Sequence, residues 1–527
     1  MATTRARAAQ VPPYRLDRTA RWRSRPAGQV AILGALIAAA AGFAPAIVPL
    51  VLGTAVAWAL GSVLVGARDG RGRLVVVALA AVAVALLLAG PWVIGTALAG
   101  KASVSIFGLP IAGATAPGWG ELIRFAIGPV ARSPITWLLV VGAALPLLIG
   151  RGARLVWAAR LWLAACASWG LALASARGAM GSFTPSVTVA LAPAALAVAG
   201  CIGLGISSFE NDLTGREFGW RQVVSVVALA FVAVGLLPVA ASAVGGRWGL
   251  PSQGVDQPLA FLSNRGPTEV ARVLWLGDPR ALPVGGWSVE PGLAYALTPD
   301  TLPDTSQVLT PAGPGPAALV AGAVRLAVNG GTVHLGRLLA SAGVRYVVVL
   351  DGLAPSAVGS LPASVSAPPP AGLRTDLLEQ DDLHVVPGEM GVQVYENDEV
   401  MPVTAQRTAP LPPVRTWSYP GPADVVGWKP VLGASTSPAA SGTVTAGTVY
   451  AGYAPAGSFT LVGDGGAAVR RPAFGWAAQY SVSRGQATLS LSQFPYVPFG
   501  VLLEVAAWVV LAGALWRRRS RAPEGTA

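Results

Sequence analysis

The sequence has 527 residues, of which 53% are hydrophobic and only 12% are charged, and its mean hydropathy is +0.57. This composition excludes an ordinary soluble protein and indicates a membrane protein that carries a polar domain. The formal net charge of +12 does not indicate a nucleic-acid partner. The segment 245–498 holds 14 basic and 17 acidic residues, and the excess of arginine lies in the termini and in short segments between apolar runs.

The first part of the chain is a basic leader, residues 1–28, followed by an apolar run over 30–65. That run is too long for one helix across a hydrocarbon core of about 30 Å. Pro45 and Pro49 divide it, because helices tend to end before a proline. We therefore predict a membrane domain of about seven spans over 29–244. The predicted spans are 29–43, 47–65, 74–98, 133–149, 155–175, 185–207 and 223–244.

A last apolar run, 499–516, is followed by four arginines in the tail 517–527. Short basic flanks mark the cytoplasmic side of a span. Two spans in 30–65 place the arginine clusters of the short loops on the same side as this tail. We therefore predict about eight spans, a cell-membrane location with both termini in the cytoplasm, and membrane lipids as partners.

The segment between the last two spans is then extracytoplasmic, and it begins with a predicted α/β unit over 245–370. Helical patterns at 317–328 and 333–342 lead into an unbroken β-branched run at 344–350. Such a run is typical of a strand buried on both faces.

A Pro/Ala-rich linker at 362–372 opens a second unit, a predicted β-rich sandwich over 371–498. Short strand patterns at 383–386 and 392–395, and more after Val425, are separated by Gly, Ser and Pro. This spacing favours an antiparallel β-sandwich. The predicted fold class is a polytopic α-helical membrane protein with a large extracytoplasmic α/β plus β-sandwich domain.

Two carboxylates are candidate site residues because of where they lie. Glu504 interrupts the last span, and an ionisable group inside a membrane is costly unless it has a function or a partner. It either serves a site, reaches the outer interface, or pairs with an arginine of another span such as Arg132 or Arg177. Glu121 lies in an amphipathic stretch expected on the outer surface. It is either a catalytic base or metal ligand, or simply a residue of the polar face.

Other polar clusters are weaker candidates. Glu379, Asp381 and Asp382 could bind a divalent cation or stand free in solvent, and no other cofactor is expected. The only histidines, His334 and His384, are far apart in the sequence and show no metal-binding spacing. Aromatic faces stack on sugar rings but also fill cores. The candidate glycan-contact residues are Trp417, Tyr419 and Trp428, with Tyr450, Tyr453 and Trp476 as further exposed-aromatic candidates.

Two short sequence segments resemble those of a known protein family. They are Trp-Leu-Gly-Asp-Pro-Arg-Ala-Leu-Pro-Val-Gly-Gly-Trp at 275–287 and Arg-Leu-Leu-Ala-Ser-Ala-Gly-Val-Arg-Tyr-Val-Val-Val at 337–349. Here the chain resembles the membrane and external portion of actinobacterial family 2 glycosyltransferase-type proteins. With Val-Tyr-Glu-Asn at 394–397, it also resembles YfhO-like membrane proteins of the envelope. The resemblance implies a place in envelope polysaccharide assembly.

The sequence also departs from this pattern. It shows no Asp-x-Asp motif of a cytoplasmic nucleotide-sugar domain, and the expected first external loop, 44–48, has no acidic residue. The resemblance therefore favours a protein that is accessory to, or derived from, a lipid-linked glycosyltransferase. An active transferase that uses a polyprenyl-phosphate sugar, with Glu121 or Glu504 in its site, is the second hypothesis. A transporter is the third. The expected partners are a polyprenyl-linked sugar or envelope glycan and a separate glycosyltransferase.

Overall fold

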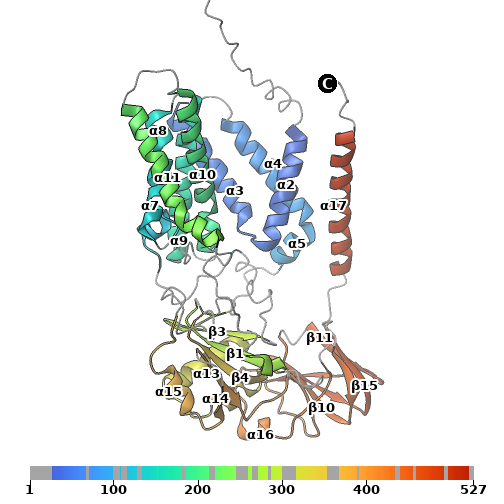
Figure 1. The fold of residues 1–527 in the computed structure, drawn as a ribbon. Coiled ribbons are helices and arrows are strands. Elements are labelled where there is room, and N and C mark those ends of the chain that lie inside the picture. The colour runs from blue at the N-terminus through green and yellow to red at the C-terminus, as the bar shows by residue number, and fades with distance from the viewer. Residues whose placement is uncertain are drawn as a thin grey trace, which may run out of the picture.

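The computed structural model of this chain describes residues 26–66, 71–98, 107, 116–126, 133–150, 152–180, 184–212, 220–244, 259–263, 271–279, 281–282, 287–298, 316–352, 367–387, 391–433, 440–454, 458–491 and 496–520. They form a bundle of apolar helices with a β-rich domain at one end (Figure 1). We call the end next to that domain the proximal end. The opposite end, where α2 (Pro26–Phe43) begins and α17 (Tyr496–Ser520) ends, is the distal end.

The bundle follows the predicted spans closely. Its other helices are α3 (Ile47–Leu64), α4 (Arg71–Leu88), α5 (Gly90–Leu98), α6 (Trp119–Ile123), α7 (Trp137–Ala143), α8 (Leu145–Ile149), α9 (Ala153–Ala176), α10 (Val187–Asp212) and α11 (Trp220–Val244). Four segments of the described chain are long and apolar enough to cross a membrane: Ile47–Leu64, Ala153–Ala176, Val187–Ser208 and Val223–Ala241. Shorter apolar helices fall at the other predicted spans: Ala27–Phe43, Gly72–Leu88, Pro134–Ile149 and Pro498–Ala514. The chain is a helical membrane protein, and the count of about eight spans stays a prediction.

Two predicted spans are interrupted, and a proline lies at each break. The span 74–98 is divided into α4 and α5, with Pro91 in the first turn of α5. The span 133–149 is divided into a 3₁₀ turn (Pro134–Thr136), α7 and α8, with Pro146 in the first turn of α8. A proline has no amide to donate, so it is tolerated in the first turn of a helix.

Pro193, in contrast, lies inside α10, where the neighbouring helix compensates for it. Ser168 of α9 donates its hydroxyl to the carbonyl of Ala190 at 2.6 Å and accepts from the amide of Ala194 at 3.1 Å. The serine therefore bridges one step of the α10 backbone ladder beside the proline. Such compensation by an adjacent helix lets a proline remain within a membrane helix.

The first part of the β-rich domain is a six-stranded sheet in the order β2-β3-β1-β4-β6-β5. Its strands are β1 (Arg272–Gly277), β2 (Trp287–Glu290), β3 (Leu293–Thr298), β4 (Val344–Leu350), β5 (Leu383–Val386) and β6 (Val392–Asn397). Strand β4 pairs in parallel with β1 and antiparallel with β6. The helices near this sheet are α13 (Pro316–Val328), α14 (Leu335–Ala340) and α15 (Leu373–Leu378).

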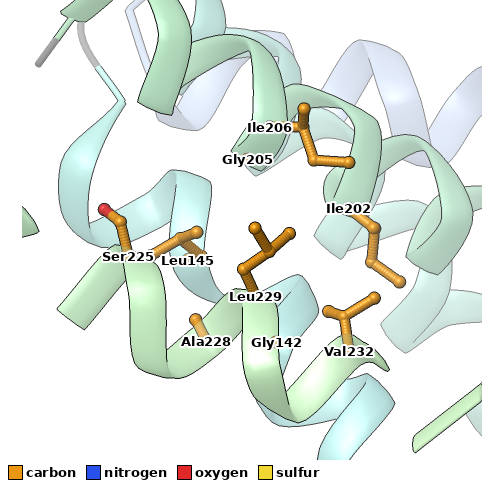
Figure 2. Close-up of a pocket in the computed structure, with 9 residues that line it drawn as sticks. All are labelled: Gly142, Leu145, Ile202, Gly205, Ile206, Ser225, Ala228, Leu229 and Val232. Atoms are coloured by element: carbon orange, nitrogen blue, oxygen red, sulfur yellow. The ribbon is translucent and has the colours of Figure 1, made fainter. Parts of the chain in front are cut away.

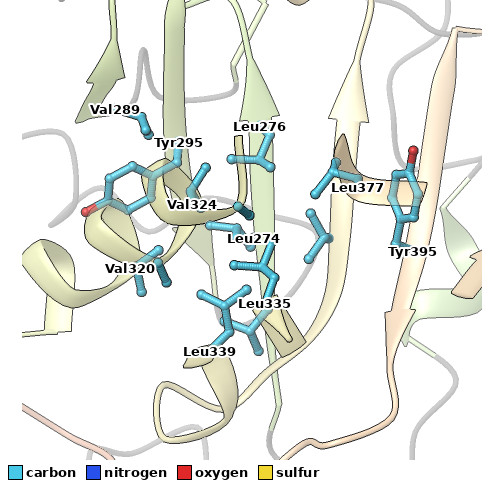
Figure 3. Close-up of a cluster of buried hydrophobic side chains, with 14 of the residues drawn as sticks. Leu274, Leu276, Val289, Tyr295, Val320, Val324, Leu335, Leu339, Leu377 and Tyr395 are labelled. Atoms are coloured by element: carbon cyan, nitrogen blue, oxygen red, sulfur yellow. The ribbon is translucent and has the colours of Figure 1, made fainter. Parts of the chain in front are cut away.

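Both faces of this sheet are covered, which confirms the prediction of a doubly buried strand. On one face, side chains of α13, α14 and α15 pack against Leu274, Tyr295 and Tyr395 (Figure 3). On the other face, residues of the segments 259–263 and 281–282 pack against Trp275 and Val348.

The predicted boundary between the α/β unit (245–370) and the sandwich (371–498) is wrong. Strands β5 and β6 lie beyond residue 370 but belong to the six-stranded sheet, so the α/β unit extends to about Asn397. The Pro/Ala-rich stretch connects two parts of one sheet. The physical reason is that β4 gains its second hydrogen-bonded neighbour only from β6.

The second part is a β-sandwich, as the strand spacing predicts. A five-stranded sheet, β13-β14-β10-β7-β8, faces a four-stranded sheet, β12-β11-β15-β9, around a core that includes Val449, Leu461, Tyr480 and Leu489. The strands are β7 (Thr404–Arg407), β8 (Lys429–Pro430), β9 (Ala440–Val444), β10 (Gly447–Ala451), β11 (Phe459–Gly463), β12 (Gly466–Ala467), β13 (Arg470–Ala473), β14 (Ala477–Val482) and β15 (Gly485–Leu491). A short helix, α16 (Pro422–Val425), lies between β7 and β8.

Buried polar side chains join the two parts of the β-rich domain. Arg272 of β1 donates to the carbonyl of Ala342 at 2.6 Å and to that of Gly452 at 2.8 Å, and burial lowers its pKa. The Tyr450 hydroxyl of β10 donates to the carbonyl of Ser341 at 2.6 Å. The Arg272 bond to Gly452 and the Tyr450 bond to Ser341 cross from the sheet unit to the sandwich, whereas the bond to Ala342 stays within the sheet unit. All three pair polar groups at a largely buried junction.

Candidate functional site

Glu121 lies on α6, which covers the proximal end of the bundle. The amide of Gly118 donates to its Oε2 at 3.0 Å, so the carboxylate caps its own helix. The neighbouring Leu122 is fully buried in a cluster that includes Trp169 of α9, while Glu121 is exposed. Exposure leaves the carboxylate accessible, and capping accounts for its position without catalysis. Its catalytic role stays a prediction.

Arg124 and Phe125, which follow Glu121, have unusual features that the sequence did not indicate. Arg124 has a buried Nε atom without a hydrogen-bond partner among the described residues. Phe125 has a φ angle of 58°, a left-handed conformation that costs a non-glycine residue about 1 kcal/mol or more. Its ring lies 6.2 Å from that of Trp169. Strain of this kind can be seen only in the folded backbone, so no sequence pattern signals it.

Glu504 lies on the one face of α17 that packs against the bundle. Gly500, Glu504, Ala507, Trp508 and Leu511 follow helical spacing and are buried or half-buried, whereas the described residues between them are exposed. A Cβ on Gly500 would lie 2.9 Å from Cβ of Pro91 in α5, and the side chains of 507, 508 and 511 pack on a cluster from α2 and α4. Glu504 therefore faces protein. The described residues provide it with no hydrogen bond or ion pair.

The aromatic candidates differ in how much of each ring is free. Trp417 is 44% exposed. The Tyr419 hydroxyl donates to the carbonyl of Leu319 at 3.0 Å, which ties it to α13. Trp428 is half-buried, with the Arg407 guanidinium carbon 4.7 Å from its ring centroid. Stacking on a sugar needs a free ring face, so Trp417 is the best placed of the three.

Two of the further aromatic candidates are not exposed. Tyr450 is fully buried and Trp476 is 6% exposed, both in the cluster between the sandwich and the sheet unit. Tyr453 is half-buried and stacks on Phe459 with ring centroids 4.9 Å apart. Core packing explains these positions, because aromatic rings bury more apolar area than other side chains.

Of the acidic residues at 379–382, Asp382 has a structural role, whereas Glu379 and Asp381 are exposed. Asp382 accepts from the amides of Gly336 and Arg337 at 2.9 and 2.8 Å, at the start of α14. Burial and the nearby Glu379 carboxylate raise the pKa of Asp376. Within the described residues, no group of three or more His, Cys, Asp or Glu side chains is placed to hold a metal ion. The divalent cation stays a prediction without a site in these ranges.

His384 belongs to a surface charge network that the sequence did not reveal. Its Nδ1 lies 3.1 Å from Oδ1 of Asp398, and its Nε2 lies 3.7 Å from Oε2 of Glu396. Glu396 also pairs with Arg345 at 3.1 Å. These residues lie on neighbouring strands or directly after one, so cross-strand pairing accounts for the network.

The outer face of the four-stranded sheet is polar but carries no charge on its strands β9, β11 and β15. Side chains on these strands alternate between the core and solvent. The outward positions are Ser441, Thr443, Thr460, Val462, Gln486, Thr488 and Ser490. The strand register sets Thr488 between Val462 and Ser441, and Gln486 donates its amide to Thr443 at 3.1 Å. We call these seven residues the hydroxyl face.

A small cavity of about 30 Å³ lies between α7, α8, α10 and α11 (Figure 2). Ser225 carries the only side-chain polar group in its lining. The volume suits about one or two water molecules, so the cavity is a small packing void that is too small for a substrate.

Comparison with solved structures shows a distant likeness to a membrane glycosyltransferase. No protein-family model matches the sequence, and no curated protein matches it. The chain aligns with the cryo-EM structure of the arabinofuranosyltransferase AftD from mycobacteria, with a TM-score of 0.37 and 13% sequence identity. The likeness covers 90% of this chain and 45% of that chain, so the chain spans less than half the length of AftD. A TM-score this low does not establish a shared fold.

Proposed function

We propose that this chain is an integral membrane protein of envelope glycan assembly, accessory to or derived from a lipid-linked glycosyltransferase, and that its β-sandwich binds the glycan. The observation that carries the proposal is the hydroxyl face. It presents hydroxyl groups and one amide on a regular sheet, without a carboxylate or a cation on its three strands. The sequence resemblance to envelope glycosyltransferase-type proteins points to the same role.

The chemistry of the hydroxyl face suits a neutral saccharide. Hydroxyl groups donate and accept hydrogen bonds, and the Gln486 amide does both, so they match the hydroxyl groups of a sugar ring. Val462 adds one exposed apolar contact, 46% exposed, in the row of Thr488. The three strands carry no charged side chain, and the carboxylate of Asp464, directly after β11, accepts from the backbone amide of Gln486 at 3.1 Å. Trp417, in the segment between β7 and α16, is a separate candidate for stacking on a sugar ring.

The test is binding of purified full-length protein in detergent to an array of neutral bacterial surface glycans. Thr488→Arg places a bulky charge in the middle of the hydroxyl face. It should weaken binding by at least about tenfold, which corresponds to 1.4 kcal/mol. Thr375→Arg, on the exposed side of α15, is the matched control and should bind as the native protein does. Equal binding by the native protein and Thr488→Arg would refute the role of this face.

The aromatic candidates are tested in the same assay. Trp417→Ala should weaken binding without changing thermal stability, because its ring is exposed. Trp428→Ala should lower stability instead, because its ring packs under Arg407 and its Nε1 donates to the carbonyl of Asp424 at 2.7 Å. Native binding by Trp417→Ala would remove that residue from the site.

An active transferase that uses a polyprenyl-phosphate sugar is the second candidate function, favoured by the exposed position of Glu121 at the proximal end. Glu121→Gln keeps a side-chain oxygen that can accept from Gly118, so the helix cap is retained. Loss of sugar transfer in this variant, with normal accumulation in the membrane, would support catalysis. Unchanged envelope glycan would support the accessory role.

A further inference from the structure

The bundle contains an apolar cavity that the proposed glycan function does not use. It has a volume of about 570 Å³ and lies between α2, α3, α4, α9 and α10. Its lining side chains are apolar except Thr54, whose hydroxyl donates to the carbonyl of Leu50 at 2.7 Å. A second cavity of about 200 Å³ adjoins it and shares Leu50, Thr54, Ala164 and Pro193. We call the two together the apolar groove. Water has few polar partners there, so hydrocarbon suits the groove better.

The apolar groove runs along much of the bundle's height. On α3 it extends from Ile47 to Trp58, which is about 16 Å along the axis at 1.5 Å per residue. Leu196 of α10 lines it and is 75% exposed, so the groove is open to the surrounding membrane. A hydrocarbon chain can therefore enter from the bilayer and lie roughly parallel to α3.

A half-buried arginine lies at the distal end of the groove. Arg160 of α9 packs against Gly61 of α3, where an added Cβ would lie 3.0 Å from the Arg160 Cα. The Arg160 guanidinium carbon is 5.5 Å from the ring centroid of Trp157, and that ring is 5.1 Å from the ring of Trp58. Trp58 and Leu161, the residue after Arg160, both line the groove. The Arg160 Nε atom is buried and has no hydrogen-bond partner among the described residues.

The helices around Arg160 offer no carboxylate nearby. Helices α2, α3, α4 and α9 contain no Asp or Glu. On α10, Gly200 lies level with Leu161, where an added Cβ would be 3.0 Å from Cδ1 of Leu161. Glu210 is ten residues farther along α10, or about 15 Å. A charged guanidinium in this setting is expensive without an anion.

We propose that the apolar groove binds an anionic membrane phospholipid, with a hydrocarbon chain along α3 and its phosphate on Arg160. The guanidinium fork matches phosphate oxygens, and the unpaired Nε is one of its donors. Trp58 and Trp157 lie beside it, as aromatic side chains do at the headgroup level of a bilayer. Basic pockets between membrane helices are the usual sites for anionic lipid headgroups. The hydrocarbon chain of the lipid thus binds the apolar groove, and its phosphate binds Arg160 at the distal end of the same groove.

The proposal is tested by native mass spectrometry of the full-length protein in mild detergent. The probes are phosphatidylglycerol and phosphatidylcholine with the same acyl chains, added in equal amounts. The native protein should retain phosphatidylglycerol about tenfold better than phosphatidylcholine, and Arg160→Gln should abolish that preference. Arg160→Lys keeps the charge but lacks the fork, so it should retain an intermediate preference. Arg177→Gln, an exposed arginine at the other end of α9, is the matched control and should behave as the native protein does.

A second variant tests the groove itself. Ala164→Leu fills both cavities and should lower retention of both lipids by about tenfold, whatever the headgroup. Equal retention of the two lipids by the native protein overturns the proposal before any variant is made. Phosphatidylglycerol preference that survives in Arg160→Gln overturns the role of Arg160, and full displacement of the lipid by inorganic phosphate overturns the role of the chain. A lipid-free dimer would mean that a second copy fills the groove.

Discussion

Tyr450, at the junction between the sheet unit and the sandwich, allows a specific prediction about the stability of the fold. This side chain is fully buried, and its hydroxyl is 2.6 Å from the carbonyl of Ser341 at the end of α14. Tyr450→Phe removes only the hydroxyl and leaves the ring in place against Trp428 and Phe474. The carbonyl of Ser341 then loses a donor in a region that water does not reach.

The expected cost is about 1–3 kcal/mol, the range for a buried group left without its partner. For a domain of roughly 200 residues this lowers the melting temperature by about 2–4 °C per kcal/mol. The assay is thermal unfolding of the full-length protein in detergent, followed by near-ultraviolet circular dichroism of its aromatic side chains.

Tyr453→Phe is the matched control for Tyr450→Phe. Tyr453 lies three residues away, stacks on Phe459 and lies beneath the Arg272 guanidinium, and both of these contacts need only the ring. Its loss of a hydroxyl should change stability by no more than about 0.5 kcal/mol. Equal melting temperatures for Tyr450→Phe and the native protein, or an equal loss in both variants, would refute the reasoning.

Four further predictions follow from single positions. Ser168→Ala should destabilise the bundle by about 1–3 kcal/mol in thermal unfolding, because two backbone groups beside Pro193 lose their bridge, and an unchanged melting temperature would contradict this. Burial raises the pKa of Tyr395 to about 12, above the ~10 of an unfolded chain, so its stabilising effect is complete below about pH 10 and is lost as the pH rises toward 12. Tyr395→Phe should therefore lose less of its neutral-pH stability than the native protein does as the pH rises toward 12, and should unfold at a higher pH. Circular dichroism measured against pH for both proteins checks this, and identical alkaline unfolding would contradict it. Glu504→Leu should lower membrane accumulation while Glu504→Gln partly restores it, and native levels and envelope phenotype with Leu would show that the carboxylate merely reaches the interface. Single cysteines at Ser306 and Ser520 test the orientation, since an impermeant maleimide should label only the first in intact cells.

Local patterns predicted the elements of this fold better than the pairing of those elements. The β-branched run of β4 predicted a doubly buried strand, and the structure has it at Val344–Leu350. The boundary at residue 370 failed because Tyr346 pairs with Glu396, 50 residues later in the chain, and no local pattern shows such a pairing. Prolines marked the helix breaks at 91 and 146, but the expected spans ignored them.

The expected exposure of two aromatic candidates, Tyr450 and Trp476, was wrong because it relied on residue type alone. Tyr450 and Trp476 are large aromatics in a predicted sandwich, and their burial depends on which side of a strand or loop faces the sheet unit. The hydroxyl face was visible in principle, because Gln486, Thr488 and Ser490 alternate with apolar residues. Arg160 falls inside the predicted span 155–175, where no sequence pattern marks it as a binding residue, and the structure sets it two turns inside α9, beside the apolar groove.

The last helix, α17, connects the sandwich to the bundle, and Glu504 lies on the face of α17 that packs against the bundle. Strand β15 of the hydroxyl face ends at Leu491, and α17 begins five residues later at Tyr496. A helix that only anchored the chain in lipid would need no polar residue on its packing face, where Leu would pack at lower cost. Glu504 lies on that face, between the Gly500 contact with α5 and the Trp508 contact with α2 and α4. Because the connection between β15 and α17 is short, we predict that Glu504→Leu, which changes the packing face of α17, also weakens the glycan binding proposed for the sandwich. Native glycan binding by this variant would contradict that prediction.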